Sequence, residues 1–303
     1  MKDIEHVKVL VVGDIMLDKY VVGNLSRLSP EAPVPIVNVT EEYKTLGGCG
    51  NVVRNIRELG AQVDCLASIA RDENGKKILD ELERIGARSL CIYGSYQTTV
   101  KERIISDERQ VQMIRIDRET TDQISDHRVI EAFKHAAREF YDIVIISDYA
   151  KGMITKGVMD FLHANQNADI IVDPKPINGF LYSDVYMITP NEKEWEVMQL
   201  ASQYSLKNVK FVLETKGRDG MILHDIDLRQ HWPVESEAVD IYNVSGAGDT
   251  VVGVMGVCMS LGLPILQAAI IANKCAAYVV TQSGTTTVPK EVFKNALDTF
   301  RGL

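Results

Sequence analysis

Short runs of β-branched and other apolar residues alternate along the chain with longer stretches in which apolar residues recur every three to four positions. The short runs are typical of buried strands, and the longer stretches are typical of helices that cover a sheet. Strands are predicted at 8–13, 63–69, 143–147, 170–173, 185–189 and 209–214, and helices at 51–59, 72–85, 124–141, 155–164, 192–203, 248–261, 264–281 and 290–300. The alternation indicates βαβ units and therefore an α/β fold with a mostly parallel sheet.

Two stretches break this rhythm, because residues 34–39 and 98–116 are rich in strand-forming residues without intervening helices. Neither stretch carries enough apolar residues to form a core of its own, which favours a small second sheet over a second domain. We therefore expect one domain over residues 1–303, with a β lid formed by about 16–40 and 91–117.

Composition narrows the class of protein. Apolar residues make up 46% of the chain and charged residues 25%, as in ordinary globular proteins. The formal net charge of −9 argues against a nucleic-acid partner. No segment has the layout of a signal peptide or the length of a membrane-spanning helix, which predicts a cytoplasmic protein without a membrane partner. The 5 cysteines lack zinc-ligand spacing, and we interpret them as apolar residues in a reducing compartment.

Small residues precede one of the helical patterns, in the run Asn-Val-Ser-Gly-Ala-Gly-Asp-Thr at 243–250. At the start of a helix the N–H groups of Gly246, Ala247 and Gly248 would be free to bind an anion such as a phosphate. Asp249 beside them can accept the proton of an attacking hydroxyl during phosphoryl transfer. The alternative is a glycine-rich turn followed by an ordinary helical acid. Neither a Walker A loop nor a dinucleotide-binding fingerprint occurs in the chain.

A second glycine-rich segment, Leu-Gly-Gly-Cys-Gly-Asn at 46–51, also opens a predicted helix. Gly47 and Gly48 let the backbone approach a ligand closely, and the side chain of Asn51 can bind hydroxyl groups. Asp14 follows the first predicted strand, at the edge of the sheet where α/β proteins bind ligands. These residues predict a site for a polyol such as a sugar. The alternative is a capped turn and a strand-end acid.

Asn191 and Glu194 lie three residues apart at the start of a predicted helix, so their side-chain oxygens share one face. Such oxygens can hold a hydrated Mg²⁺, with water between the protein and the metal. The alternative is a capping box, in which the two side chains only satisfy the backbone at the helix start.

Three basic residues are candidates for binding a phosphate group. Lys101 and Arg103 share one face of a predicted strand, and Lys175 follows another strand in the run Asp-Pro-Lys. Their side chains can hold a phosphate group on the acceptor. The alternative is a solvated charged surface.

The two glycine-rich segments and Asn191-x-x-Glu194 occur in the same order as the signatures of the ribokinase/PfkB carbohydrate kinases, and residues 7–288 resemble that family. The resemblance implies a ribokinase-like three-layer fold with a small β-sheet lid that forms a homodimer. It also implies ATP and Mg²⁺ as cofactors, with K⁺ as a further cation. Asp249 would be the catalytic base, and the amides of 246–248 would form the anion hole. The positions implied for ATP are Asn191, Thr215, Gly217, Gly220 and Asn273.

The run Arg-Leu-Ser-Pro-Glu-Ala-Pro-Val-Pro at 27–35 is similar to a segment typical of the D-glycero-β-D-manno-heptose 7-phosphate kinases in this family. So are shorter segments at 13–18, 101–103, 114–117, 147–152 and 173–175. The resemblance implies phosphorylation of the anomeric hydroxyl of that sugar phosphate to the 1,7-bisphosphate, a precursor of the ADP-heptose used for bacterial lipopolysaccharide. Two alternatives stay open. One is a PfkB-family kinase for ribose, fructose or a hexose phosphate, and the other is a catalytically silent sugar-binding regulatory protein.

Overall fold

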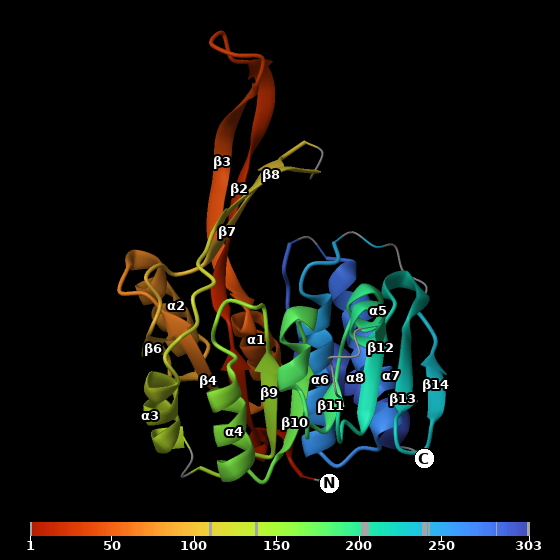
Figure 1. Cartoon of the computed structure of the whole chain (residues 1–303). Coiled ribbons are helices and arrows are strands. Elements are labelled where there is room, and N and C mark those ends of the chain that lie inside the picture. Colours follow the sequence, from red (N-terminus) through yellow and green to blue (C-terminus); the bar gives the residue numbers. More distant parts are fainter. Residues whose placement is uncertain are drawn as a thin grey trace.

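Two β-sheets organise the computed structural model, which describes residues 2–108, 111–136, 139–200, 206–237, 241, 243–282 and 284–301 (Figure 1). The larger sheet has the strand order β14-β13-β12-β11-β10-β9-β1-β4-β5, and β6 pairs separately with β4. Its strands are β1 (Lys8–Gly13), β4 (Gln62–Ile69), β5 (Arg88–Ser89), β6 (Ile92–Tyr93), β9 (Ile143–Ser147), β10 (Asp169–Asp173), β11 (Met187–Ile188), β12 (Phe211–Thr215), β13 (Met221–Asp225) and β14 (Gln230–Val234). Pairing is parallel from β12 to β5, whereas β13 and β14 form an antiparallel edge. The predicted, mostly parallel sheet is confirmed.

Both faces of the large sheet are buried, because the side chains of its central strands alternate between two apolar cores. Val9 and Val11 of β1 belong to one core, and Leu10 and Val12 belong to the other. The first core also contains residues of α1 (Cys49–Leu59), α2 (Glu73–Arg84), α6 (Ala247–Ser260), α7 (Ile265–Val280) and α8 (Lys290–Arg301). The second contains residues of α3 (Asp126–Ala136), α4 (Lys156–Asn165) and α5 (Glu192–Leu200). The described residues also form short 3₁₀ helices at η1 (Ile4–His6), η2 (Pro176–Leu181) and η3 (Gly217–Asp219).

The smaller sheet rises from the edge of the large sheet at which the parallel strands end (Figure 1). Its strand order is β3-β2-β7-β8, with β2 (Ile15–Leu28), β3 (Pro35–Gly48), β7 (Val100–Ser106) and β8 (Val111–Arg118). β2 and β3 form a long antiparallel hairpin, and β7 pairs with β2 in parallel. Only Asp14 separates β1 of the large sheet from β2 of the small one. We call the small sheet the lid.

Several element boundaries differ from the predicted ones. The helix predicted at 51–59 begins at Cys49, because Gly48 precedes it with a φ of +57°. The lid was predicted to stop near residue 40, but β3 continues to Gly48. Most of its residues are exposed, so no apolar pattern reveals the strand. The helix predicted at 124–141 is described only to Ala136, and the end of the helix predicted at 192–203 lies outside the described residues. Among the described residues, no helix is long and apolar enough to cross a membrane.

Candidate active site

Asp249 lies in the first turn of α6, at the edge of the large sheet where the lid begins. Gly246 caps this helix with a φ of +82°, a conformation that favours glycine. A Cβ at Gly246 would lie 2.7 Å from Nδ2 of Asn51 and 2.9 Å from Cγ2 of Thr285. A side chain at position 246 would therefore collide with the residues beside Asp249.

Backbone N–H groups are available at the start of α6. The N–H of Ala247 donates to the carbonyl of Val244 at 3.4 Å, and that of Thr250 donates to the carbonyl of Gly246 at 3.0 Å. Within the described part of the chain, the N–H groups of Gly246, Gly248 and Asp249 donate to no acceptor. A Cβ at Gly248 would meet nothing within 4 Å, so this residue borders open space. Free amides at a helix start bind an anion, although the predicted amide of Ala247 is already engaged.

The carboxylate of Asp249 is 5% exposed and accepts two hydrogen bonds. Nδ2 of Asn51 donates to Oδ2 and the hydroxyl of Tyr149 donates to Oδ1, each at 2.9 Å. Burial raises the pKa of Asp249 to about 6, and the two hydrogen bonds oppose that rise. A carboxylate with this pKa is mostly ionised near neutral pH and is close to the optimum for a general base.

Asn51 was predicted to bind sugar hydroxyls, and the structure gives its side chain two protein partners. Besides donating to Asp249, it accepts a hydrogen bond at Oδ1 from Arg54 at 3.3 Å. Asn51 is fully buried near the start of α1. Its clearest role in this structure is to hold Asp249.

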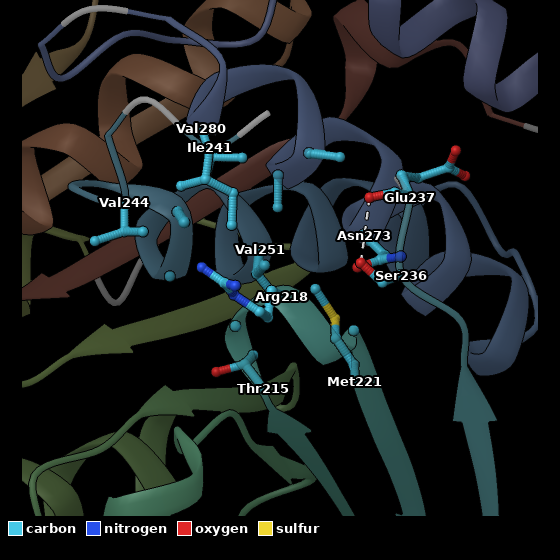
Figure 2. Close-up of a pocket in the computed structure, with 16 residues that line it drawn as sticks. Thr215, Arg218, Met221, Ser236, Glu237, Ile241, Val244, Val251, Asn273 and Val280 are labelled. Carbon is cyan, nitrogen blue, oxygen red and sulfur yellow. Dashed lines mark hydrogen bonds between the residues drawn. The ribbon is translucent and has the colours of Figure 1, made fainter. Parts of the chain in front are cut away.

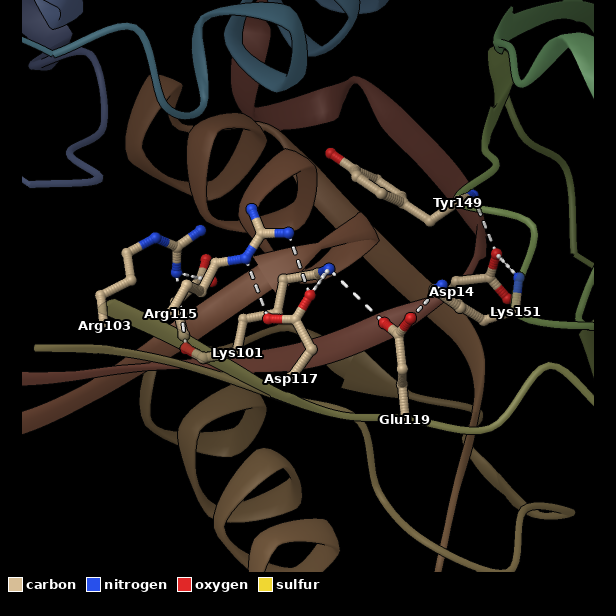
Figure 3. Close-up of polar contacts among 9 residues, drawn as sticks. Asp14, Lys101, Arg103, Arg115, Asp117, Glu119, Tyr149 and Lys151 are labelled. Atoms are coloured by element: carbon tan, nitrogen blue, oxygen red, sulfur yellow. Dashed lines mark hydrogen bonds and ion pairs between the residues drawn. The ribbon is translucent and has the colours of Figure 1, made fainter. Parts of the chain in front are cut away.

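Asp14 accepts hydrogen bonds from three backbone N–H groups of the turn at 148–153, two of which, from Tyr149 and Lys151, are seen in Figure 3. Oδ2 accepts from Tyr149 at 2.8 Å and from Lys151 at 3.0 Å, and Oδ1 accepts from Met153 at 3.1 Å. Burial and the neighbouring charge of Asp148 raise the pKa of Asp14 to about 6. Asp14 was predicted to bind a polyol, but most of its hydrogen-bonding capacity serves this turn.

Gly47 and Gly48 let the end of β3 approach the start of β2. A Cβ at Gly47 would lie 2.4 Å from Oδ2 of Asp18, and one at Gly48 would lie 2.4 Å from the carbonyl oxygen of Asp14. The two glycines therefore serve backbone packing at the base of the lid. No contact in the structure tests their predicted part in binding a sugar.

The three predicted phosphate-binding cations each have their own carboxylate partners. Lys101 lies 3.4 Å from Asp117 and 3.5 Å from Glu119. Figure 3 shows this cluster on the lid. Arg103 pairs with Asp18 and lines a polar cavity of about 540 Å³ between the lid and residues 243–245.

Lys175 is placed differently from the two lid cations. It pairs with Glu194, and its Nζ lies 5.4 Å from the ring centroid of Tyr149. Its positive charge also lowers the pKa of Asp249. Lys175 therefore belongs with the residues around Asp249 and the predicted metal motif.

Asn191 and Glu194 form the capping box that was the alternative to a metal site. The N–H of Asn191 donates to Oε2 of Glu194 at 3.0 Å, and the N–H of Glu194 donates to Oδ1 of Asn191 at 2.9 Å. Oε1 of Glu194 pairs with Lys175. In the described ranges, no group of three His, Cys, Asp or Glu side chains is arranged to hold a metal ion. This donor set fits a hydrated Mg²⁺ held through water and does not fit a direct protein cage.

Asp173 was not singled out by the sequence. Burial and the charges of nearby carboxylates, Asp249 foremost, raise its pKa well above the usual range, while Lys175 opposes the rise. The signal available in the sequence was its position at the carboxyl end of β10, directly before Pro-Lys.

A largely apolar pocket of about 230 Å³ lies beside the start of α6 (Figure 2). Its walls include Met221, Val251 and Val280, and it extends to Ala247 and Gly248. The predicted ATP residues Thr215, Gly217, Gly220 and Asn273 all line it, and so does Arg218, which lies between Gly217 and Gly220. Asn273 donates from its amide to the carbonyl of Glu235 at 2.7 Å. Asn191 lies next to this pocket, because its backbone forms an isolated β-bridge with Thr215.

The pfkB family carbohydrate kinases match this chain over residues 7–291. The chain belongs to the pfkB family of carbohydrate kinases. One curated relative, "Bifunctional protein HldE" of Desulfatibacillum aliphaticivorans, is 36% identical over 96% of the chain. The chain spans only 63% of the length of that relative.

Solved structures of a phosphofructokinase and a ribokinase share the fold of this chain. Phosphofructokinase-2 from Escherichia coli in complex with potassium matches with a TM-score of 0.77 at 14% identity, covering 97% of this chain and 98% of that one. Ribokinase from Thermotoga maritima matches with a TM-score of 0.71 at 19% identity, covering 97% and 99%. These structures confirm the predicted ribokinase-like fold. The family match confirms the prediction of an ATP-dependent carbohydrate kinase.

Proposed function

We propose that residues 1–303 form one kinase domain, which transfers the γ-phosphoryl group of ATP to the anomeric hydroxyl of D-glycero-β-D-manno-heptose 7-phosphate. The product would be the 1,7-bisphosphate, which leads to the ADP-heptose used for lipopolysaccharide. The segments at 27–35 and 147–152 and the relatives named HldE support this acceptor over ribose, fructose or a hexose phosphate.

The observation that carries the proposed chemistry is the position of Asp249 beside free amides. Its carboxylate is ionised near neutral pH and is held by Asn51 and Tyr149. In the proposed reaction Asp249 accepts the proton of the acceptor hydroxyl. The N–H groups of Gly246 and Gly248 stabilise negative charge on the transferred group, with the positive end of the helix dipole behind them.

Residues on the nucleotide side would hold ATP and its metal. Thr215, Gly217, Gly220 and Asn273 line an apolar pocket that is suited to a nucleobase. Asn191 and Glu194 would hold Mg²⁺ through water, and the ion would supply positive charge to the phosphates of ATP when bound. The potassium complex of the related phosphofructokinase-2 supports K⁺ as a further cation.

The acceptor side of the proposal rests on the cavity under the lid. Its lining combines Arg103 with the polar side chains of Tyr20, Tyr43, Asn243 and Ser245, and it also includes the carboxylates of Glu41 and Asp107. The hydroxyl, amide and carboxylate groups suit the hydroxyls of a sugar, and Arg103 suits its distal phosphate. We propose that closure of the lid excludes water, which otherwise competes as the acceptor.

We also propose a homodimer formed through the lid. β8 is an edge strand of that sheet, and its side chains Val111, Met113 and Ile114 are about half exposed. An apolar edge strand of this kind is a template for pairing with a second copy of the chain. Sedimentation of the chain and of Met113→Lys would test this arrangement, with loss of the dimer expected for the variant.

The acceptor can be identified with purified chain, ATP and Mg²⁺. ADP release would be measured with heptose 7-phosphate, ribose, fructose and fructose 6-phosphate, and phosphorus NMR would locate the new phosphate. We expect the highest kcat/KM for heptose 7-phosphate, with phosphate added at the anomeric carbon. Preference for a neutral sugar would refute this acceptor.

Asp249→Asn is the matched control for the chemistry. It should fold but lose turnover by about 10²–10⁴-fold, because an amide cannot accept the proton. Sugar binding without product formation by the unmodified chain would instead favour a silent sugar-binding protein.

A further inference from the structure

The hydroxyl of Tyr149 donates a hydrogen bond to Oδ1 of Asp249 at 2.9 Å. Asn51 donates to Oδ2, so each oxygen of the carboxylate has one donor. Burial and the adjacent charge of Asp249 raise the pKa of Tyr149 well above its usual value. The phenol therefore keeps its proton at any physiological pH and acts toward Asp249 as a donor.

The backbone around Tyr149 is fixed by two buried carboxylates. Asp14 accepts from the N–H groups of Tyr149 and Lys151, on either side of Ala150. Asp148 accepts from the N–H of Ala150 at 2.6 Å. Ala150 has a φ of +56°, which a non-glycine residue retains only where the surrounding contacts determine its conformation. The turn is thus held in one conformation, and Tyr149 is the residue that it presents to Asp249.

The same turn also contacts the lid (Figure 3). Nζ of Lys151 lies 2.8 Å from Oε1 of Glu119, which follows β8. Oε2 of Glu119 lies 3.5 Å from Nζ of Lys101 on β7. Through these contacts Tyr149 is connected to the lid on one side and to Asp249 on the other.

We propose that Tyr149 is a positioning residue for phosphoryl transfer, whose hydroxyl orients the carboxylate of Asp249 toward the acceptor. A carboxylate held by donors on both oxygens cannot rotate about its Cβ–Cγ bond without losing them, so its free lone pairs keep one direction. During the reaction the acceptor oxygen bonds to the γ-phosphorus, and the bond from that phosphorus to the oxygen of ADP breaks. The acceptor proton passes to Asp249, while Tyr149 keeps its own. The inference rests on the proposed function only in taking Asp249 as the base, and it is independent of the acceptor.

Loss of the Tyr149 hydroxyl would also change the basicity of Asp249. A hydrogen bond donated to a carboxylate stabilises its ionised form, so removing the donor raises the pKa. The other charged groups that act on Asp249 are Asp18, which raises its pKa, and Lys175, which lowers it, and Asp173 also lies close. Tyr149→Phe alters none of these groups and keeps the aromatic ring beside Lys175.

The first test is a carbon-13 NMR titration of the aspartate carboxyl groups in the full chain without substrates. Asp249→Asn would identify the resonance of Asp249. We expect its pKa to rise by about one unit in Tyr149→Phe, as for loss of a hydrogen bond to a charged group. Tyr141→Phe is the matched control, because Tyr141 donates to the buried Asp64 at 2.6 Å at the opposite end of β9. It should leave the pKa of Asp249 unchanged. An equal pKa in Tyr149→Phe and the wild type would overturn the inference.

The second test is the pH profile of kcat and kcat/KM with the acceptor identified above. In Tyr149→Phe the acid limb should move to higher pH. At pH values above this limb, kcat of Tyr149→Phe should be roughly tenfold lower than that of the wild type, because the base is misdirected. KM for ATP should be the same in both proteins, because ATP binding is intact. A wild-type kcat in the alkaline plateau would overturn the positioning role. If the wild-type chain phosphorylates no acceptor, the proposed function fails, and the titration still decides the contact between Tyr149 and Asp249.

Discussion

Asn51 donates from its side-chain amide to Oδ2 of Asp249 at 2.9 Å, although 198 positions separate the two residues in the chain. Asn51 lies in the first turn of α1, and Asp249 lies in the first turn of α6. The bond therefore joins the two glycine-rich segments where their helices begin. Each segment alone is a glycine-rich helix start, and the contact between them makes a single site.

A carboxylate in place of the Asn51 amide should move activity to higher pH. In Asn51→Asp a second negative charge would stand beside Asp249 and raise its pKa above the present value of about 6. Less of the base is then ionised at pH 7, so activity should be low there and recover in alkaline buffer. The pH profile of kcat/KM measures this. Asn165→Asp, at the exposed end of α4, makes the same charge change and should leave the profile unaltered.

The raised pKa of Asp249 makes the folded state less stable as the pH rises. Its folded-state pKa is about 6, against 3.8 for the free side chain, so the folded protein binds more protons between these values. Stability therefore falls from about pH 4 to about pH 6, by about 3 kcal/mol for this one group.

Urea unfolding at pH 4.5 and 7.5 would measure this effect together with the part of the Asp173 pKa shift that the charge of Asp249 causes. The free energy of unfolding of Asp249→Asn, minus that of the wild type, should increase with pH. Asp249 is not among the causes that shift the pKa of Asp14, so we expect Asp14 to contribute equally in both proteins and to cancel in the difference. Parallel pH dependences in the two proteins would contradict the assignment.

Asp14→Asn should loosen the turn that carries Tyr149. Both carboxylate oxygens of Asp14 accept hydrogen bonds from backbone N–H groups. An amide has only one acceptor oxygen, so in the variant the NH₂ group would face at least one of these N–H donors and leave it without an acceptor. We expect a loss of about 1–3 kcal/mol in the free energy of unfolding, together with reduced kcat. Chemical denaturation and kinetics measure both. Asp227→Asn, on the exposed loop before β14, should change neither.

Arg103 and Lys175 should act kinetically on two different sides of the reaction. Arg103 lines the cavity under the lid, so Arg103→Ala should raise KM for a phosphorylated acceptor. Lys175 pairs with Glu194 and acts on Asp249, so Lys175→Ala should lower kcat with little change in that KM. Steady-state kinetics with each substrate varied in turn would measure the split. Equal effects of the two substitutions on KM for the acceptor would contradict it.

The large sheet was predictable because its strands are buried on both faces and its helices on one, which leaves strong local patterns. The lid hairpin was predicted only in part. Its outer residues on β3 are mostly exposed, and their pairing with β2 depends on backbone hydrogen bonds rather than on apolar side chains. β14 lies at an edge of the sheet with exposed residues and was not predicted for the same reason.

The candidate site was predictable where its residues are neighbours in the sequence, as in the run that contains Gly248 and Asp249. The partners of these groups were not, because they come from distant segments. Tyr149 is 100 positions from Asp249, and Asp14 is 135 positions from Tyr149. Residue types and spacing indicated a carboxylate, an amide and a set of glycines, but not which of them would contact one another.

Gly248 offers a way to separate folding from chemistry. It lies in an ordinary helical position, and beyond its chain neighbours and the backbone of α6 a methyl group there would meet no described atom within 4 Å. Alanine is also the better helix former, by about 1 kcal/mol. The added carbon would nevertheless stand beside the free amides of α6. We therefore expect Gly248→Ala to give a well-folded domain without kinase activity. Such a variant would be suited to determining the structure of the kinase with both unreacted substrates bound.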